Sequence, residues 1–496
     1  MIVVIVAALV AVAPVTAPEG NSEFKTPASV PAAIDSPPGW TPDTLLSLND
    51  VQESREPSLA IDSRGRLHAV WKDNRRLHGR DEVHYRCKDS TGWGELFSVG
   101  NLDTVHNWPD VAVDAADNVH VSFMRWYGAP YDYYDVGYRR RDGVTGDWGA
   151  EERLTVNDSL GHSAYPQTVC IGDTVFVFWF RQRLTPAEIV YSYNNGSGWS
   201  APERVTKDDA VPAGYYDIHA TPDGWLHVIW QDNRSDTLHL WHRFHSGDSW
   251  SEPERVTFHD YQCIEPDMDS DSAGNIALVY SGGDPEDRLH YRVWDRGTMT
   301  WGPVTHFYSW SGVPYPKVGV NKVTGEAHLT HVGHQGVWCL GYRRLDPGTG
   351  QWTDSTMLTW YDVATGPAKP VLDADGYVHL VFWDQRYGSQ EEIQYKTNRL
   401  ASGAAEESSK CEVRSASRPT FVRGVLPWDC QPVSSGETGG CTRPVLLDAA
   451  GRRVMVLVPG ENDVGHLAPG VYFVREDGPR VRGSRGPRVT KVVIGR

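Results

Sequence analysis

Residues 39–50 read GWTPDTLLSLND, a tryptophan turn followed by a short apolar strand, and this stretch decides the fold. The same phrase returns as GWSAPERVTKDD at 198–209 and as SWSEPERVTFHD at 249–260, each time at the end of a longer unit. The turn tryptophan recurs six times, with 51 residues in each of the last four intervals: Trp93, Trp148, Trp199, Trp250, Trp301 and Trp352. A fixed period of this length indicates a repeat architecture.

Each unit holds four short segments in which apolar and polar residues alternate. A proline opens the unit, except in the fourth, where Asp217 takes this place: Pro57, Pro109, Pro166, Pro266, Pro316 and Pro370. A second strand follows, as in LHAVW (67–71), then a third, as in EVHYRC (82–87), and the fourth comes after the tryptophan turn. Four strands of period two in about 50 residues predict the blade of a β-propeller.

Counting second strands gives seven units, but the seventh stops at EIQYKTNRL (392–400), before a tryptophan turn and a fourth strand. The opening stretch 39–50 supplies what is missing. We therefore predict an all-β, seven-bladed β-propeller over residues 39–397, closed by an N-terminal strand. Such closure removes the sheet edges that an open array would expose.

The segments outside the repeats point to export. Residues 1–17, MIVVIVAALVAVAPVTA, form an apolar run of signal-peptide length that ends in small residues, although no basic residue precedes it. Residues 18–38 and the Gly/Ser-rich residues 398–440 are expected to be linkers. Residues 441–496 alternate short strands with glycine turns, which predicts a small C-terminal β-sandwich.

This last segment resembles the C-terminal sorting domain of the bacterial type IX secretion system. The resemblance lies in the spacing of Gly451-Arg452, Gly460, Asn462, the run LAPGVYF (467–473) and KVVI (491–494). It implies transport across the outer membrane by the type IX secretion machinery. The protein is then expected to be secreted or held on the surface of a bacterium.

The charge distribution argues against nucleic acid as a partner. The formal net charge is −17, and from residue 441 onward ten Lys and Arg outnumber five acids, which leaves about −22 on the rest. An acidic body repels phosphate backbones. The seven cysteines have no CxxC spacing, which argues against zinc, and leave disulfides possible in an exported protein, with at least one thiol unpaired.

One end of the ring is expected to carry the function, because the loops before strand one and between strands two and three emerge there together. Aromatic residues gather in these loops: Trp108, Trp126, Tyr127, Tyr165, Tyr215, Trp310 and Tyr315. Three Asp/Arg pairs occupy equivalent loops: Asp73 with Arg75, Asp232 with Arg234, and Asp384 with Arg386. Aromatic faces stack on sugar rings while Asp and Arg bind hydroxyls and carboxylates, which predicts a glycan site. Alternatively, the pairs hold the loops by blade-to-blade ion pairs.

Residues 39–397 resemble the sialidase and BNR-repeat superfamily. Its Asp-box turn, Ser-x-Asp-x-Gly-x-x-Trp, is degenerate here, as in CKDSTGW (87–93), which keeps a glycine and the tryptophan. The resemblance implies four candidate catalytic residues of an exo-acting sialidase: Arg55, the loop acid Asp81, and the pair Glu265 and Tyr315. It fails at VYSGG (279–283), where no arginine follows the second strand, and Tyr165-Pro166 matches as well as Tyr315-Pro316.

Two patterns suggest metal ligands but have simpler interpretations. DMDSDSAGN (267–275) has the acid spacing of a calcium loop, yet Asp271 takes the turn position of Asp62, which leaves Asp267 and Asp269 on a strand. Five histidines share one position of the second strand, where a packing or hydrogen-bonding role is expected: His68, His120, His227, His328 and His379. We expect no metal and no cofactor.

The sequence therefore predicts an exported, monomeric propeller that binds extracellular glycan at one end of the ring. One alternative is an exo-acting glycoside hydrolase or a polysaccharide lyase at the same end. The other is a protein-binding surface scaffold. Convergence of Arg55, Glu265 and Tyr315 would favour the hydrolase, whereas their scattering around the rim would favour binding.

Overall fold

The computed structural model divides the chain into two units, residues 1–405 and 406–496. In the first unit it describes residues 36–48, 52–74, 81–100, 105–126, 133–155, 162–182, 187–206, 213–234, 237–283, 288–307, 314–334, 337–359, 365–386 and 390–400. In the second unit it describes seven strands. A search of these residues found no helix that could cross a membrane. The expected signal peptide lies outside them and stays a prediction.

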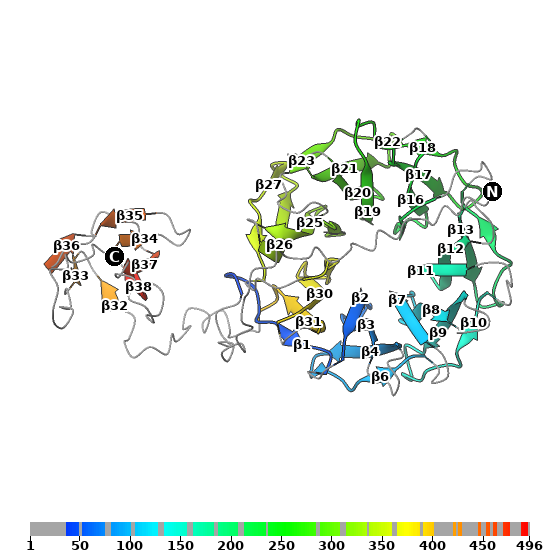
Figure 1. Cartoon of the computed structure of the whole chain (residues 1–496), viewed down its shortest axis with the longest axis horizontal. Coiled ribbons are helices and arrows are strands. Elements are labelled where there is room, and N and C mark those ends of the chain that lie inside the picture. The colour runs from blue at the N-terminus through cyan, green and yellow to red at the C-terminus, as the bar shows by residue number, and fades with distance from the viewer. Residues whose placement is uncertain are drawn as a thin grey trace, which may run out of the picture. The chain divides into compact units, whose positions relative to one another are not determined.

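The first unit is a ring of seven antiparallel sheets, numbered here as blades I to VII (Figure 1). Blade I has β2 (Ser54–Ile61), β3 (Leu67–Asp73), β4 (Glu82–Asp89), β5 (Gly92–Trp93) and β6 (Phe97–Ser98). Blade II has β7 (Val105–Val113), β8 (Val119–Trp126), β9 (Tyr134–Arg141) and β10 (Glu152–Arg153). Blade III has β11 (His162–Ile171), β12 (Thr174–Gln182), β13 (Glu188–Asn194) and β14 (Glu203–Arg204). Blade IV has β15 (Tyr216–Ala220), β16 (Leu226–Asp232), β17 (His239–His245) and β18 (Glu254–Arg255).

The other three blades follow the same order. Blade V has β19 (Cys263–Ser270), β20 (Ile276–Gly282), β21 (Leu289–Asp295), β22 (Thr300–Trp301) and β23 (Thr305–Phe307). Blade VI has β24 (Lys317–Val320), β25 (Ala327–His334), β26 (Val337–Asp346), β27 (Gln351–Trp352) and β28 (Thr356–Met357). Blade VII has β29 (Val371–Leu372), β30 (Val378–Asp384), β31 (Glu392–Thr397) and β1 (Thr44–Leu45). The all-β, seven-bladed prediction is confirmed.

The N-terminal strand closes the ring as predicted. β1 pairs antiparallel with β31, with Thr44 opposite Tyr395 and Leu45 opposite Gln394. Figure 1 shows the two strands side by side in blade VII, although they come from opposite ends of the repeat region. The backbone N–H of Leu46 also donates to the carbonyl of Ile393. The last blade is therefore complete only when residues near the start of the chain join it.

The hydrophobic core lies in the seams between neighbouring blades. Each of its clusters contains buried side chains from two adjacent blades. On β12, for example, Phe178 packs in the cluster shared with blade IV, and Val177, on the opposite face, packs in the cluster shared with blade II. At every seam a turn tryptophan meets an aromatic residue of the neighbouring blade, with ring centroids 4.8–5.8 Å apart: Trp93–Tyr395, Trp148–Tyr85, Trp199–Tyr138, Trp250–Tyr191, Trp301–His242, Trp352–Tyr291 and Trp40–Tyr342. The opening stretch thus provides the seventh tryptophan through Trp40.

The repeated histidines have the hydrogen-bonding role expected from the sequence. In blade I, Nδ1 of His68 lies 2.8 Å from the hydroxyl of Tyr85, and its Nε2 lies 3.3 Å from a carboxylate oxygen of Asp62. His120 and His379 repeat this arrangement, His328 keeps the tyrosine, and His227 contacts His242 instead. Asp62 also accepts the backbone N–H groups of Arg64 and Arg66 in its turn. His68 therefore links the turn between the first two strands to Tyr85 on the third strand.

The second unit, taken by itself, is also made of strands. One sheet has the order β32 (Thr420–Val422), β38 (Arg488–Ile494), β37 (Gly470–Glu476), β34 (Val445–Leu447) and β35 (Arg453–Val456). A second sheet pairs β33 (Val425–Trp428) with β36 (Gly460–Asp463). Strands β32 and β33 fall in the segment expected to be a linker, and the domain boundary at 440 and the sorting role stay predictions.

Candidate ligand-binding rim

A repeated kink marks the first strand of most blades. In five blades the residue before the opening proline has a positive φ of 44–56°: Glu56, Trp108, Tyr165, Glu265 and Tyr315. In blades I, II, III and V the pairing register slips at this point, as between Arg55 and Ser58. Bulky residues seldom adopt this conformation, and such bulges redirect side chains beside functional sites.

The strand register corrects the sequence alignment in two blades. Asp217 lies opposite Ile229 as Asp267 lies opposite Val279, so Tyr216, not Asp217, occupies the proline position of blade IV. Tyr215 is then the counterpart of Glu265. In blade VII, Val371 pairs with His379 as Gly319 pairs with His328 in blade VI. Hence Ala368, not Pro370, matches Pro316.

We call the residues at this kinked position the inner rim: Glu56, Trp108, Tyr165, Tyr215, Glu265 and Tyr315. Their interactions form an arc across six blades. The rings of Trp108 and Tyr165 meet edge to face at 5.0 Å. Burial and the nearby Glu265, Tyr165 and Tyr315 raise the pKa of Tyr215 to about 12. The exposed fraction is 42% for Trp108 and 48% for Tyr215, so both rings are open to a ligand.

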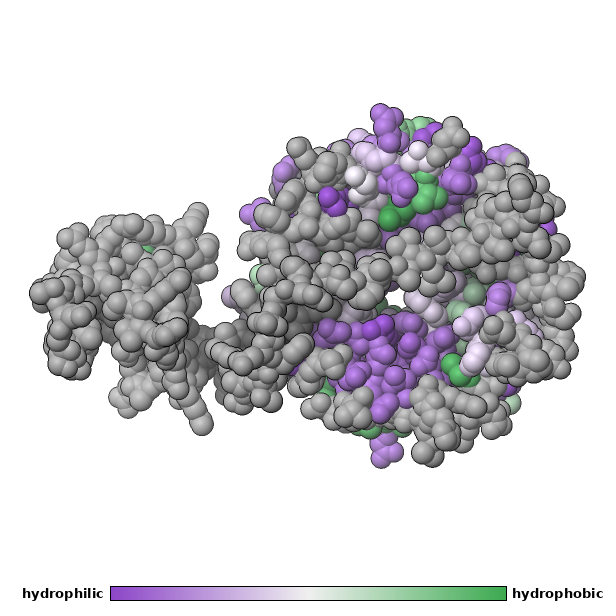
Figure 2. Space-filling model, in the orientation of Figure 1, coloured by the Kyte–Doolittle hydropathy of each residue, from purple (hydrophilic) through white to green (hydrophobic). Residues whose placement is uncertain are grey.

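At one end of the arc, Glu56 is held from both sides. Its Oε2 accepts the backbone N–H of Trp108 at 2.8 Å, and its Oε1 lies 3.8 Å from Nζ of Lys72. The same Nζ lies 3.6 Å from a carboxylate oxygen of Asp81, a residue that the sequence put forward as a catalytic acid. Burial raises the pKa of both carboxyls, and the lysine opposes this. Figure 2 shows hydrophilic side chains gathered over β2 and β3 beside the central opening.

At the other end, the predicted pair Glu265 and Tyr315 occupies the same kinked position of the adjacent blades V and VI. Burial raises the pKa of the Tyr315 hydroxyl, and the charge of Glu265 raises it further. Burial also raises the pKa of Glu265, with Lys317 opposing. A tyrosine with a raised pKa is a poor nucleophile unless a base takes its proton, and Glu265 is the neighbour able to do so.

Arg55, the third expected member of the sialidase set, is engaged elsewhere. Its Nη2 lies 2.5 Å from a carboxylate oxygen of Glu391, and it pairs with Glu53 as well. Its guanidinium also lies 5.7 Å from the ring centroid of Trp383 in blade VII. Arg55 and Asp81 thus lie among the paired charges of blade I, whereas Glu265 and Tyr315 belong to blades V and VI.

The two described Asp/Arg pairs act within their own blade. Arg234 lies 2.6 Å from Asp232, and Arg386 binds both Asp384 and Asp43 of the closing segment. Both strand-end carboxylates are fully buried, which favours a loop-holding role over direct glycan contact, but the ion pairs lie within a blade and not between blades as the alternative expected.

The other predicted glycan-binding residues are placed as follows. Asp73 is buried and accepts the Ser54 hydroxyl at 2.8 Å. Trp126 ends β8, half-buried, and Trp108 lies on the rim. The remaining three lie outside the described residues: Arg75, Tyr127 and Trp310.

Two residues after the rim position of each first strand, a second ring of side chains connects neighbouring blades. We call it the first-strand belt: Ser58, Asp110, Gln167, Asp217, Asp267, Lys317 and Lys369. Five members accept a backbone N–H of the next blade, for example Thr168 to Asp110 at 2.7 Å and Val318 to Asp267 at 2.8 Å. The belt therefore fixes the spacing of the blades directly beneath the inner rim.

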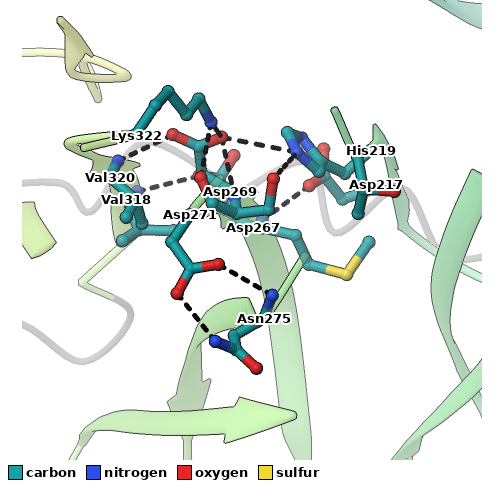
Figure 3. A network of polar contacts seen from close by, with 12 residues as sticks. Asp217, His219, Asp267, Asp269, Asp271, Asn275, Val318, Val320 and Lys322 are labelled. Carbon is teal, nitrogen blue, oxygen red and sulfur yellow. Dashed lines mark hydrogen bonds and ion pairs between the residues drawn. The ribbon is translucent and has the colours of Figure 1, made fainter. Parts of the chain in front are cut away.

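Below the belt, blades IV to VI share a partly buried polar network (Figure 3). Asp269 accepts the backbone N–H of Val320 at 2.7 Å and pairs with Lys322, while Nε2 of His219 contacts the Ser270 hydroxyl at 2.9 Å. Asp271 accepts two N–H groups of its own turn, so Asp267 and Asp269 lie on a strand, as expected. No three potential metal ligands cluster among the described residues.

His219 should make the stability of the propeller sensitive to acid. Burial lowers its pKa from 6.5 to about 3. At pH values between these two, the imidazole is therefore protonated in the unfolded state but neutral in the folded state. Stability is then lost as the pH falls below about 6.5, by at most about 1.4 kcal/mol per pH unit for this group. We expect the His219→Gln variant to lose less stability than the wild type between pH 6.5 and 4 in urea denaturation. An equal loss would show that His219 binds its proton in the fold.

Sequence reasoning missed the rim residue Glu56 and the lysines Lys72, Lys317 and Lys369. A signal for the first was present, because the dipeptides Glu-Pro, Trp-Pro and Tyr-Pro recur at one place in the repeat. No comparable pattern marked the lysines, whose partners come from other strands or blades.

The chain is thus a seven-bladed β-propeller with aromatic and acidic side chains around one end of its first strands. No protein-family model and no curated protein matches it. Similar solved structures include the polysaccharide lyase Uly1, with 11% identity over 68% of this chain and 88% of that one and a TM-score of 0.48. The α-L-arabinanase of Penicillium chrysogenum has 13% identity over 74% of this chain and 96% of that one, with a TM-score of 0.41. The Trypanosoma rangeli sialidase has 10% identity over 72% of this chain and 59% of that one, with a TM-score of 0.44. At these values the similarities carry no argument about the ligand.

Proposed function

We propose that the inner rim binds a glycan. The observation that carries this proposal is the composition of one kinked position, which presents four aromatic rings and two carboxylates from six successive blades. Aromatic faces stack on the apolar faces of sugar rings, and carboxylates accept hydrogen bonds from sugar hydroxyls. The strained backbone at five of these positions supports a role in binding, because structure seldom maintains such strain without one.

A protein-binding scaffold is less well supported. Such a partner would need a broad apolar patch. Among the described residues the exposed large apolar side chains are scattered over different blades and both ends of the ring: Leu48, Trp108, Val144, Tyr215, Phe258, Met299, Val323 and Tyr377. Export to a bacterial surface is part of the proposal, and it rests on residues 1–17 and on the resemblance of residues 441–496 to a sorting domain.

The proposal is tested by a glycan-array screen of the full chain, followed by titration of each bound sugar. We expect Trp108→Ala to weaken binding about tenfold, since a well-placed aromatic contact contributes about 1–1.5 kcal/mol. The matched control is Tyr377→Ala, which removes an exposed ring from a hairpin at the other end of the ring and should leave the affinity unchanged. Equal affinities for both variants would place the ligand away from the rim, and no binding by the wild type would contradict the proposal.

The equivalent positions of Glu265 and Tyr315 in the adjacent blades V and VI favour glycoside hydrolysis as the second candidate. Each bound sugar should therefore be tested for release of product. If product forms, Tyr315→Phe is expected to abolish turnover while binding persists, because the ring stays and only the hydroxyl is lost. Turnover that survives in Tyr315→Phe would assign the chemistry to other residues.

A further inference from the structure

The charges around the inner rim follow one rule, which bears on the kind of sugar that fits. In three groups of paired residues at or beneath the rim, carboxylates outnumber the cations that they bind. Because the inference concerns the ligand of the rim, it rests on the proposed function. The three groups of charges that carry it come from different blades, and each has a formal charge of −1 when its acids are ionised.

The first group surrounds Lys72 in blade I. Its Nζ lies between Glu56, at 3.8 Å, and Asp81, at 3.6 Å. One ammonium therefore serves two carboxylates, and the group carries a net charge of −1. Both acids are only partly exposed, so bulk water screens them weakly.

The second group surrounds Arg55, where blades I and VII meet. Its guanidinium binds Glu391, which is almost fully buried, and also binds Glu53. The Glu391 carboxylate additionally accepts a hydrogen bond of 2.9 Å from the amide of Gln385. This group also carries a formal charge of −1, so a ligand carboxylate that approached the 42% exposed side chain of Arg55 would meet two acids already paired with it.

The third group lies under Glu265. Lys317 and Lys369 both approach Oδ1 of Asp267 at 3.2 Å, and Lys369 lies 3.9 Å from Asp217. Lys369 also donates to the carbonyl of Met268 at 3.0 Å. With Glu265 on the same strand, two lysines face three carboxylates, which gives a formal charge of −1 when all three are ionised, although burial raises the pKa of Asp217 to about 7.

Among the described residues, an anionic sugar would therefore meet excess negative charge at the rim and cations that already have partners. An ammonium group would meet the opposite situation. Glu56 and Glu265 can accept its hydrogen bonds, and a cation beside them favours the ionised carboxylates that burial disfavours. The rings of Trp108, Tyr165, Tyr215 and Tyr315 add faces on which a cation is attracted to the π electrons.

We propose that the inner rim selects amino sugars, binding a glycan that carries free ammonium groups in preference to its N-acetylated form and rejecting glycans that carry carboxylates. Glu56 and Glu265 accept hydrogen bonds from the ammonium groups, and the four aromatic rings stack on the sugar. The ligand class is thus an oligomer or polymer of amino sugars, for which glucosamine oligomers serve as the probe.

The test uses oligosaccharides of equal length titrated into the full chain. Glucosamine oligomers and their fully N-acetylated counterparts differ only at the amine, and an oligomer containing glucuronate adds a carboxylate. We expect the glucosamine form to bind at least tenfold tighter than the acetylated form, with the glucuronate oligomer weakest. The preference should shrink as salt rises from 50 to 500 mM, because screening weakens charge recognition.

Variants assign the preference to the rim. Glu56→Gln and Glu265→Gln should each reduce the ratio of the two affinities to below about threefold, whereas Glu326→Gln, which alters an acid paired with Arg344 at the other end of the ring, should leave the ratio unchanged. Having two rim variants guards against one that does not fold. Equal or tighter binding of the acetylated or glucuronate oligomer would overturn the selectivity while leaving glycan binding intact. Failure of every oligosaccharide to bind would overturn both proposals.

Discussion

Replacing Lys396 by methionine is expected to lower the free energy of unfolding of the propeller by about 3–5 kcal/mol. The Lys396 ammonium is fully buried and lies 2.7 Å from Asp43 of the closing segment, with the Ser36 hydroxyl and the Thr41 carbonyl as further acceptors. Arg386 binds the other oxygen of Asp43 and also binds Asp384. Two buried cations thus balance two buried carboxylates, and loss of the lysine leaves one carboxylate uncompensated.

The measurement is guanidinium denaturation of the full chain followed by tryptophan fluorescence. Arg343→Met provides the matched control, because Arg343 occupies the same third-strand position in blade VI but donates to a neutral carbonyl, that of Thr353. We expect it to cost only about 1 kcal/mol. Similar losses in both variants would mean that the closing segment contributes no more than an ordinary blade contact.

The fold could be predicted because its signals are local and repeated. Trp40, the period of the later tryptophans and the alternation in each strand all lie within a few residues of the structure they specify. Ring closure could be inferred by counting strands. The seventh blade lacks a fourth strand, and the opening stretch is the segment that can supply it.

The site could be predicted only in part, because its decisive features depend on register and on long-range contacts. Glu265 and Tyr315 were put forward by the resemblance to sialidases, and the structure places them at the same kinked position of adjacent blades. The partnership of Arg55 with Glu391, 336 residues away, has no local signal. Nor does the register that places Lys369 in the belt, since Pro370 beside it suggests a different alignment.

The belt gives the second large effect. Asp267→Ala is expected to destabilise the propeller by about 3 kcal/mol, the upper range for a hydrogen bond made by a charged group. The Asp267 carboxylate is almost fully buried, accepts the backbone N–H of Val318 at 2.8 Å and lies 3.2 Å from both Lys317 and Lys369. Its loss leaves a buried N–H without an acceptor and two lysines with too little opposing charge. The measurement is again guanidinium denaturation.

Ser58→Ala tests whether this cost comes from the charge or merely from the belt position. Ser58 stands at the equivalent place in blade I, accepts the Val111 N–H at 3.4 Å and donates its hydroxyl to a carboxylate oxygen of Asp110 at 2.7 Å, so the loss of this uncharged side chain should cost about 1.5 kcal/mol. Asp267→Asn separates the two contributions further, because its amide oxygen can still accept the Val318 N–H but carries no charge. A loss for Asp267→Asn close to that of Asp267→Ala would assign the stabilisation to the lysines. A loss close to that of Ser58→Ala would assign it to the backbone hydrogen bond, and the belt would then be a spacer between blades whose charge contributes little to the stability of the ring.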